Sequence, residues 1–591
     1  MTARRSEAQL AEALAWIVRL PLLGDRELAG LLGIDEIDAR YLRVELDQQG
    51  WVEWLAPRVV ELDEQRRAAF LRADALDDLA ACSGFAAHEI AHRAPVRQTD
   101  VLARIPRIAT VTAVNRLLAE LAAQLRAQGE MALVDAGSLP IASANRWWPF
   151  GADAYGVVRG RRGAARFFVT WDRAGVPDGY RRLRIRKWAA EVNPAEPPWV
   201  FVVCADAHAA RVWDAELRSQ ASQAALSEVR LTTADEVLAS GPRAAIWSIP
   251  GAPARLRFEQ ALPLRSTDLA ALLAFPGMCL HQRPSNMPVL RDRLRIAAVR
   301  PAARSIREDT AALAIVTSAA DKACLDWLAR HPRLSVSELA LFLELPGRVV
   351  ARRLELLAGD HAVRRLEIEG TELWCVTART LRMLAEAEGV PWNGYERYGA
   401  VSAPSTADDA ATRPSMAHQL GINHVFARLA RDAQAAGWRL GVWRNEAESA
   451  HLFVSDGRRA WIRPDGSGAF WRGHEERPFL LEYDRGTLDA GDYRGKFAGY
   501  MHYFETTEWR ERFSTEPQLL FVGADRRAEQ RVRSAVVANG ATHLPILLTT
   551  EGPVSSGAGS WRWASVARDA ERGALFPAVA GSLSVGRLHG E

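Results

Sequence analysis

The sequence has 591 residues, of which 48% are hydrophobic and 25% charged, a composition typical of soluble globular proteins that predicts roughly four domains. Its 75 basic and 72 acidic side chains leave a formal net charge of +3, so any preference for nucleic acid must be local. Neither a secretion signal nor an uninterrupted run of 18 apolar residues occurs, and the five cysteines form no metal-binding pattern. We therefore expect a cytoplasmic protein without a membrane span.

Residues 1–80 are predicted to form a first winged helix-turn-helix. Apolar residues recur at helical spacing in three short segments, and a strand follows at 50–56. The third helical segment carries Arg40 and Arg43, but it also contains five acidic residues, Asp35, Glu36, Asp38, Glu45 and Asp47. DNA phosphates repel such a load of acids. Dimerisation or domain packing is thus the favoured role of this module, with DNA contact as the alternative.

Residues 81–255 are predicted to hold a helical connector and a first α/β domain. The stretch from Arg159 to Trp188 contains ten basic and two acidic side chains, enough for a run of phosphate contacts. Our candidate DNA-binding residues from it are Arg181, Arg182, Arg184, Arg186 and Lys187. Four tryptophans flank the stretch and could stack on unpaired bases: Trp147, Trp148, Trp171 and Trp188. The alternative is that the tryptophans are core residues and the arginines form a solvated face.

After a connector at 256–305, residues 306–395 are predicted to form a second winged helix-turn-helix. Helical spacing marks 322–330, 334–345 and 347–357, and Gly370 separates two strand-like runs. A recognition helix and its wing must present basic side chains to the DNA groove and backbone. The candidates for these contacts are Arg348, Arg352, Arg353, Arg364 and Arg365.

A second α/β domain is predicted at 416–555, between a linker of small and polar residues at 396–415 and a tail at 556–591. The chain resembles itself at an offset near 312. Residues 463–485 match 151–173, and residues 423–437 match 115–129. The chain is therefore predicted to be a multidomain α/β (α+β) protein, a tandem duplication of a winged helix and an α/β domain.

A candidate carboxylate site lies in the second α/β domain. Glu482 and Asp484 are two residues apart on a predicted strand, so they project from one face. Asp465 ends a neighbouring strand segment and is expected close to both if the strands pair. Three carboxylates are ligands that favour binding of Mg²⁺ or Mn²⁺. Such an ion can activate water at a phosphodiester. We predict Asp465, Glu482 and Asp484 as metal ligands.

Lys496, on the following helix, completes the predicted catalytic set because its ammonium could face a developing phosphate charge. A solvated helix lysine is the alternative, and Asp484 could instead form a buried salt bridge with Arg485 or a nearby arginine. Further acids, Glu446 and Glu448, are weaker candidates. For His418, Asn423 and His424 we favour capping or packing over metal binding.

The first α/β domain departs from this pattern. Thr170 stands in the place of Glu482, which leaves Asp153 and Asp172 as its matching carboxylates. Lys187 falls about one helical turn beyond the place of Lys496. Because one ligand of three is missing, we predict a basic and inactive first copy.

The order of a winged helix, "PDG" at 464–466, "LEYDRGT" at 481–487 and a helix with Lys and Tyr residues resembles the replication-relaxation family of plasmid and integrative-element proteins. The resemblance covers roughly 310–550, and 10–255 more weakly. That family is similar to the PD-(D/E)XK nuclease superfamily in its α/β core. The resemblance implies that Asp465 is the PD aspartate, Glu482 the acidic ligand, and Lys496 a displaced lysine; Asp484 stands where that pattern usually has lysine.

The expected function is that of a DNA-binding, replication-relaxation-like protein of a plasmid or mobile element. Its second α/β domain would be a Mg²⁺-dependent endonuclease that nicks or relaxes DNA. One alternative is a non-catalytic regulator or scaffold that uses its winged helices. Another is a defence or mobile-element component that is active only with a partner. The expected partners are DNA and a second copy or another protein, and no membrane.

Overall fold

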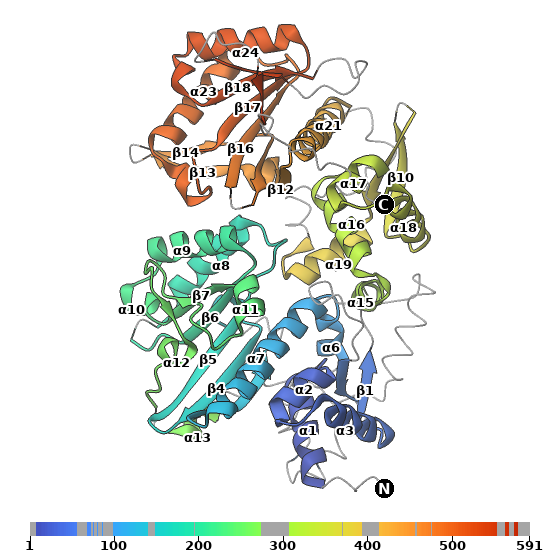
Figure 1. The fold of residues 1–591 in the computed structure, drawn as a ribbon, viewed down its shortest axis with the longest axis vertical. Helices are drawn as coiled ribbons and strands as arrows, with labels where there is room; N and C mark the ends of the chain where they lie inside the picture. Colours follow the sequence, from blue (N-terminus) through green and yellow to red (C-terminus); the bar gives the residue numbers. More distant parts are fainter. Residues whose placement is uncertain are drawn as a thin grey trace, which may run out of the picture. The chain divides into compact units, whose positions relative to one another are not determined.

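The computed structural model describes residues 7–55, 68–72, 98–139, 148–193, 195–266, 268–273, 306–368, 370–392, 413–455, 458–473, 475–551, 562–566 and 573–576, together with residues 75, 80 and 86. Two compact units of mixed α/β structure contain them (Figure 1). Unit 1 comprises Met1–Asp326, Gly359–Ala362 and Ala378–Tyr395; unit 2 comprises Trp327–Ala358, Val363–Thr377 and Glu396–Glu591. Among the described residues, no helix has the length and apolar character needed to cross a membrane.

The chain begins with three short helices and a hairpin. These are α1 (Glu7–Arg19), α2 (Asp25–Leu32), α3 (Glu36–Gln48), β1 (Val52–Leu55) and β2 (Ala68–Leu71). Gly33 ends α2 in the left-handed conformation, with φ 73°, which glycine adopts without a Cβ clash. Asp35 caps α3 by accepting a hydrogen bond from the Asp38 amide at 2.7 Å. The helices and antiparallel hairpin follow the predicted order.

The first α/β domain is built on a seven-stranded sheet of order β3-β4-β5-β6-β7-β8-β9. Its strands are β3 (Met131–Ser138), β4 (Ala154–Gly160), β5 (Gly163–Trp171), β6 (Trp199–Cys204), β7 (Val229–Thr233), β8 (Trp247–Ser248) and β9 (Arg255–Leu256). Strands β5, β6 and β7 run parallel, and the other pairs are antiparallel. The domain also contains α6 (Gln98–Arg104), α7 (Ile108–Gln128), η2 (Pro149–Gly151), α8 (Asp178–Glu191), α9 (Ala207–Gln220), α10 (Gln223–Leu226), α11 (Ala234–Ser240), α12 (Phe258–Ala261) and α13 (Leu269–Leu273).

Helices cover both faces of this sheet. Leu117 and Leu121 of α7 belong to the same core as Phe201 of β6, whereas α8 and α9 pack on the opposite face, where Val200 and Val202 point. Alternate residues of a strand face opposite sides, so β6 is apolar throughout.

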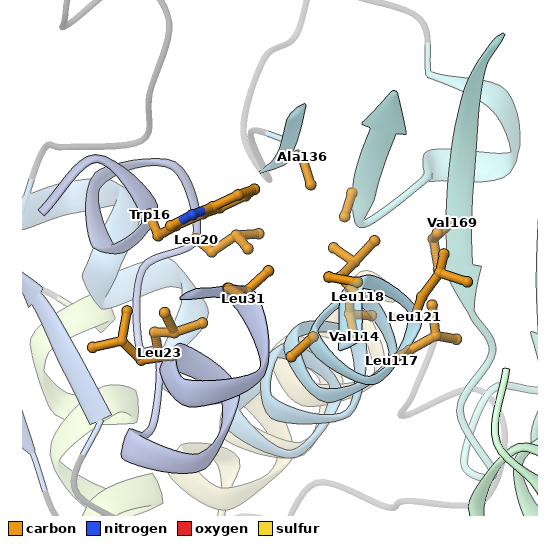
Figure 2. Packing of buried hydrophobic residues seen from close by; sticks show 14 of the residues in the cluster. Trp16, Leu20, Leu23, Leu31, Val114, Leu117, Leu118, Leu121, Ala136 and Val169 are labelled. Atoms are coloured by element: carbon orange, nitrogen blue, oxygen red, sulfur yellow. The ribbon is translucent and has the colours of Figure 1, made fainter. Parts of the chain in front are cut away.

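The first core continues from the sheet into the N-terminal helices. Figure 2 shows Trp16, Leu20 and Leu31 on one side of Leu118 of α7, and Val169 of β5 on the other side. All belong to one cluster of buried apolar side chains. Removing such area from water stabilises by about 25 cal/mol per Å². The N-terminal module and the first α/β domain thus share a single core.

The second half repeats this plan. Its helical module contains α15 (Ile306–Val316), α16 (Ala319–Arg330), α17 (Val336–Leu343), α18 (Gly347–Gly359), the hairpin β10 (Val363–Ile368) and β11 (Thr371–Val376), and α19 (Ala378–Glu388). A capping box between Ser335 and Glu338 begins α17. Gly370, with φ 75°, lies at the hairpin turn, as the sequence predicts.

The second α/β domain has the sheet order β12-β15-β16-β17-β18-β19-β20, which corresponds strand for strand to the first sheet. Its strands are β12 (Arg439–Asn445), β15 (Gly466–Arg472), β16 (Glu475–Asp484), β17 (Gln518–Gly523), β18 (Ile546–Thr550), β19 (Arg562–Ser565) and β20 (Gly573–Ala574), beside a separate hairpin of β13 (His451–Ser455) and β14 (Arg458–Ile462). Its helices are α21 (Arg413–Ala435), α22 (Glu446–Ser449), α23 (Ala490–Glu505), η4 (Glu508–Glu511), α24 (Arg526–Ala538) and η5 (Ala541–His543).

Matching local details support the predicted duplication. Asn115 donates from Nδ2 to the carbonyl of Pro21 at 3.3 Å, and Asn423 donates in the same way to Pro332 at 3.0 Å. The residue after each proline has positive φ, 65° at Leu22 and 66° at Arg333. Each half therefore ties its helical module to its long central helix by the same buried hydrogen bond.

Three predicted boundaries differ from the structure. Strand β9 and helix α12 extend the first α/β domain beyond residue 255, helix α21 begins inside the predicted linker, and strands β19 and β20 lie within the predicted tail. Edge strands of two to four residues are too short to show a clear alternation in sequence.

Candidate functional site

Asp465 lies next to the end of β16. It immediately precedes β15, which pairs antiparallel with β16 in the register Gly466↔Leu481, whereas the strand that ends before it, β14, pairs with β13. The aspartate thus begins the paired strand, whereas the sequence pattern placed it at a strand end. Its Oδ2 accepts a hydrogen bond from the Tyr483 amide at 2.8 Å, and its Oδ1 is 2.9 Å from Nε2 of His418.

Glu482 is buried, with 1% of its surface exposed. Its Oε2 lies 2.5 Å from Nζ of Lys496, and its Oε1 accepts a hydrogen bond from the hydroxyl of Tyr500. Burial raises the pKa of Glu482 to about 7; Asp465 adds to this rise and Lys496 opposes it. The carboxyl group is therefore poised to take up or release a proton near neutral pH.

The two partners of Glu482 are held in their protonated forms. Burial alone would lower the pKa of Lys496, but Glu482 and Asp465 outweigh it and raise that pKa. Burial and the neighbouring Glu482 raise the pKa of Tyr500 well above its ordinary value. A buried, protonated phenol is a weak nucleophile, so Tyr500 serves as a hydrogen-bond donor to the carboxylate.

Asp484 has separate partners. Its Oδ1 accepts a hydrogen bond from the Gly486 amide at 2.6 Å, and its Oδ2 accepts one from the hydroxyl of Tyr493. Glu482 and Asp484 each receive a tyrosine hydroxyl from α23, the helix packed on this face of the sheet.

The expected Mg²⁺ or Mn²⁺ does not fit this arrangement. Hydrogen bonds or an ion pair already occupy both oxygens of Asp465, Glu482 and Asp484. Within the part of the chain that the structure describes, no group of three or more His, Cys, Asp or Glu side chains is placed to hold a metal ion.

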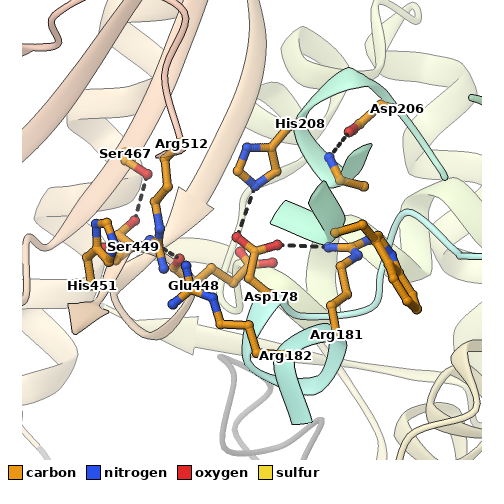
Figure 3. Close-up of polar contacts among 12 residues, drawn as sticks. Asp178, Arg181, Arg182, Asp206, His208, Glu448, Ser449, His451, Ser467 and Arg512 are labelled. Carbon is orange, nitrogen blue, oxygen red and sulfur yellow. Dashed lines mark hydrogen bonds and ion pairs between the residues drawn. The ribbon is translucent and has the colours of Figure 1, made fainter. Parts of the chain in front are cut away.

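The remaining acids of this region hold structural contacts. Glu446 forms an ion pair with Arg463 at 2.6 Å, and Glu448 forms one with Arg330 at 3.0 Å. Nearby, Arg512 donates to the carbonyl of Glu448, and Ser449 donates to Ser467 at 2.9 Å (Figure 3). These contacts tie α22 to its surroundings.

The first α/β domain has a counterpart of Asp465 but no counterpart of the Glu482 carboxyl group. Oδ2 of Asp153 accepts a hydrogen bond from the Trp171 amide at 2.9 Å, as Asp465 does from Tyr483. Thr170, buried to 1%, occupies the place of Glu482. Arg184 follows Thr170 by as many residues as Lys496 follows Glu482. Arg184 is therefore the structural counterpart of Lys496. Lys187 lies three residues further along the same helix.

Arg181, a predicted DNA contact, is 4% exposed and forms ion pairs with two aspartates. Its Nε is 2.7 Å from Asp172, and its Nη1 is 2.9 Å from Asp178, which His208 also contacts at 2.9 Å (Figure 3). These aspartates outweigh burial and raise the pKa of Arg181. Its guanidinium is committed to a buried charge pair.

Other members of the basic stretch are also paired. Arg182 and Arg186 both contact Glu216, at 3.7 and 2.7 Å. Trp171 and Trp188 are core residues, with 5% and 1% of their surfaces exposed, and Trp147 lies outside the described residues. Arg184 and Lys187 form no ion pair within the described parts of the chain.

Helix α18 presents two exposed arginines, Arg348 and Arg352, four residues apart on one face. Neither forms an ion pair with a described residue. On the hairpin, Arg365 is neutralised by Glu355 at 3.7 Å and Glu372 at 3.2 Å. The other two predicted contacts, Arg353 and Arg364, are half-buried.

The equivalent helix of the first module, α3, differs at the same two places. Ile37 and Tyr41 stand there, 64% and 56% exposed. The arginines of α3 turn instead to Asp25, with Arg40 at 3.4 Å and Arg43 at 2.6 Å. The corresponding surface is basic in the second module and apolar in the first.

Comparison with known proteins assigns the region that contains α18 and β16. Residues 325–519 match the family model described as replication-relaxation, which confirms the resemblance seen in the sequence over this span. No curated protein and no solved structure matches the chain.

Proposed function

Since residues 325–519 belong to the replication-relaxation family, we propose that this protein acts in the replication of a plasmid or mobile element by binding DNA through α18 and the β10–β11 hairpin. The observation that supports this proposal most directly is the pair Arg348 and Arg352, exposed and without ion-pair partners among the described residues. In a winged helix-turn-helix the third helix enters the major groove, and the wing reaches the phosphate backbone.

The corresponding surface of the first module lacks unpaired cations, which supports DNA binding by the second module. Its third helix carries Ile37 and Tyr41 where α18 carries arginines, and Asp25 neutralises Arg40 and Arg43. Phosphate contacts need cations that are not already paired. We therefore assign DNA contact to the second module and a protein-contact role to the first.

Fluorescence anisotropy of a labelled duplex with the full chain tests the proposal. We expect wild-type affinity to fall steeply with salt, and Arg348→Ala/Arg352→Ala to weaken binding to every sequence and lower the salt slope by about two. Arg40→Ala is the matched control, because Arg40 is also exposed on a third helix but is paired with Asp25. An unchanged slope in the double variant would contradict the assignment.

A second candidate function is phosphodiester cleavage by the second α/β domain. It is favoured by one observation, the buried Glu482 whose pKa of about 7 lies beside the Lys496 ammonium. Such a carboxylate can act as general base near neutral pH, and the ammonium can face a phosphate oxygen. Opening of the site would have to expose Glu482 first.

Nicking of supercoiled plasmid tests this candidate. Wild type, Glu482→Gln and Asp465→Asn are compared with Mg²⁺, with Mn²⁺ and with a chelator, and Glu505→Gln on the exposed face of α23 is the control. Nicking that both site variants abolish would support cleavage. If wild type does not nick under any of these conditions, cleavage is excluded while the DNA-binding proposal is unaffected.

A further inference from the structure

A cationic cavity of about 300 Å³ lies in unit 1, at the carboxyl-terminal edge of β3 and β5. Five cationic side chains line it: Arg104, Arg107, Arg173, Arg184 and Lys187. Asp153 is the one carboxylate among the lining residues. The aromatic lining residues are the half-buried Trp148 and the core residues Phe150 and Trp188. This edge of the sheet is the counterpart of the place that Glu482 and Lys496 occupy in the second copy.

Three of the arginines converge on the end of α19. Arg107 donates from Nε to the Glu386 carbonyl at 2.8 Å, and Arg184 donates from Nη2 to the Gly389 carbonyl at 3.3 Å. A Cβ at Gly389 would stand 3.2 Å from Nη2 of Arg107 and 3.3 Å from Nη1 of Arg173. Carbonyls at a helix C-terminus carry partial negative charge, so they hold the guanidinium groups close together.

The lining of the cavity keeps an excess of positive charge, although Asp100 acts electrostatically on Arg104 and the Glu386 carboxyl group on Arg107. Asp153 is already engaged by Nη2 of Arg173 at 2.8 Å. Arg104, Arg107 and Arg184 form no ion pair with any carboxylate of the described residues. Burial, together with Arg173 and the other nearby arginines, lowers the pKa of Arg107 to about 9. Buried like charges are costly unless a counter-charge joins them.

We infer that this cavity binds the phosphate monoester of a nucleotide, supplied either by a free mononucleotide or by the 5′-phosphorylated end of a DNA strand. Guanidinium groups match phosphate oxygens with paired, charge-assisted hydrogen bonds. Trp148 offers an aromatic surface for a base, and the volume is at the lower end of the range for small-molecule sites. A single nucleotide therefore fits better than a long stretch of polymer.

The difference between the two copies at these positions explains why the cationic cavity occurs in the first copy. In the second copy Lys496 is neutralised by Glu482, whereas in the first Thr170 supplies no charge and Arg184 stands at the place of the lysine. Loss of the acid leaves a cation free to hold an anionic ligand. This inference does not depend on DNA contact at α18.

Calorimetric titration of the full chain tests it, in the Arg348→Ala/Arg352→Ala background so that α18 contributes no oligonucleotide binding. The probes are dAMP, inorganic phosphate, and one short single strand with a 5′-phosphate or a 5′-hydroxyl. We expect saturable binding of dAMP, of the phosphorylated strand, or of both, and the pattern identifies the source. Arg184→Met should weaken it roughly tenfold or more, whereas Arg186→Met, on the same helix but outside the cavity, should not.

Thermal unfolding distinguishes ligand binding from a purely structural role. If the arginines only cap α19, Arg184→Met lowers the Tm of the ligand-free protein, and dAMP does not raise the Tm of wild type. If the cavity awaits an anion, the ligand-free Tm of Arg184→Met is no lower than that of wild type, and dAMP raises only the wild-type Tm.

Four results would overturn the inference. They are no saturable binding of any probe, equal affinity in wild type and Arg184→Met, a 5′-hydroxyl strand that binds as tightly as a 5′-phosphate strand that does bind, and inorganic phosphate bound as tightly as dAMP. The last would remove the nucleotide from the assignment.

Discussion

Nζ of Lys496 on α23 lies 2.5 Å from Oε2 of Glu482, near the carboxyl-terminal end of β16 in the second sheet. In the first sheet the corresponding positions are Arg184 and Thr170, and the arginine has no carboxylate opposite it there. The same scaffold thus places a charge-balanced pair in one copy and an excess of cations in the other. One difference between the copies, Thr170 in place of Glu482, therefore changes the charge balance at this position.

The raised pKa of Glu482 predicts a pH dependence of stability. The folded protein retains a proton on Glu482 up to about pH 7, whereas the unfolded chain releases it near 4.5. The folded state therefore binds more protons within this window, and the free energy of unfolding falls as pH rises from about 4.5 to 7. Glu482→Gln removes the titration, so the wild type should lose on the order of 1–3 kcal/mol relative to this variant over the window.

Urea unfolding at several pH values between these limits measures the difference. Glu505→Gln is the control, because its side chain is 62% exposed on the same helix as Lys496. Its curve should run parallel to that of wild type. A constant difference between wild type and Glu482→Gln would show that folding does not raise the pKa of Glu482.

Arg181 is predicted to be essential for the stability of unit 1. Arg181→Met leaves Asp172 and Asp178 buried without their cation, and breaking a buried pair costs about 3–5 kcal/mol. Arg186→Met, whose side chain is 54% exposed, should cost about 0–1 kcal/mol. Chemical denaturation measures the free energy of unfolding of both variants. Equal decreases would show that Arg181 contributes no more to stability than an exposed arginine.

The two asparagines that anchor the helical modules are predicted to be equivalent. Asn115→Ala and Asn423→Ala each remove the donor to a buried proline carbonyl, at a cost of about 1–3 kcal/mol. Asn193→Ala, on an exposed turn, is the comparison variant and should change stability little. Chemical denaturation measures the free energy of unfolding of the three variants. A decrease in only one of Asn115→Ala and Asn423→Ala would show that the two modules are anchored differently.

The apolar surface of α3 is predicted to be dispensable for DNA binding. Ile37→Ser/Tyr41→Ser should leave both affinity and salt slope unchanged, since neither side chain carries charge. The same anisotropy titration that measures Arg348→Ala/Arg352→Ala provides the reading. A lowered salt slope in the α3 variant would mean that the first module also contacts phosphates.

The sequence by itself was sufficient to predict the repeat, the three helices of each module, the hairpin of the second module, and the family resemblance of residues 325–519. These features depend on local signals. Apolar residues at helical spacing, alternation along strands and a left-handed Gly370 are properties of neighbouring residues.

The partners of each charged side chain were decided only by the tertiary structure. Whether Asp484 meets a metal, Arg485 or Tyr493 depends on the rotation of α23 over the sheet, and the structure places Tyr493 there. The cationic cavity draws on α6, α7, α8 and the end of α19, segments far apart in the chain. Charge balance in a buried site is a sum over such distant neighbours, so no local pattern can report it.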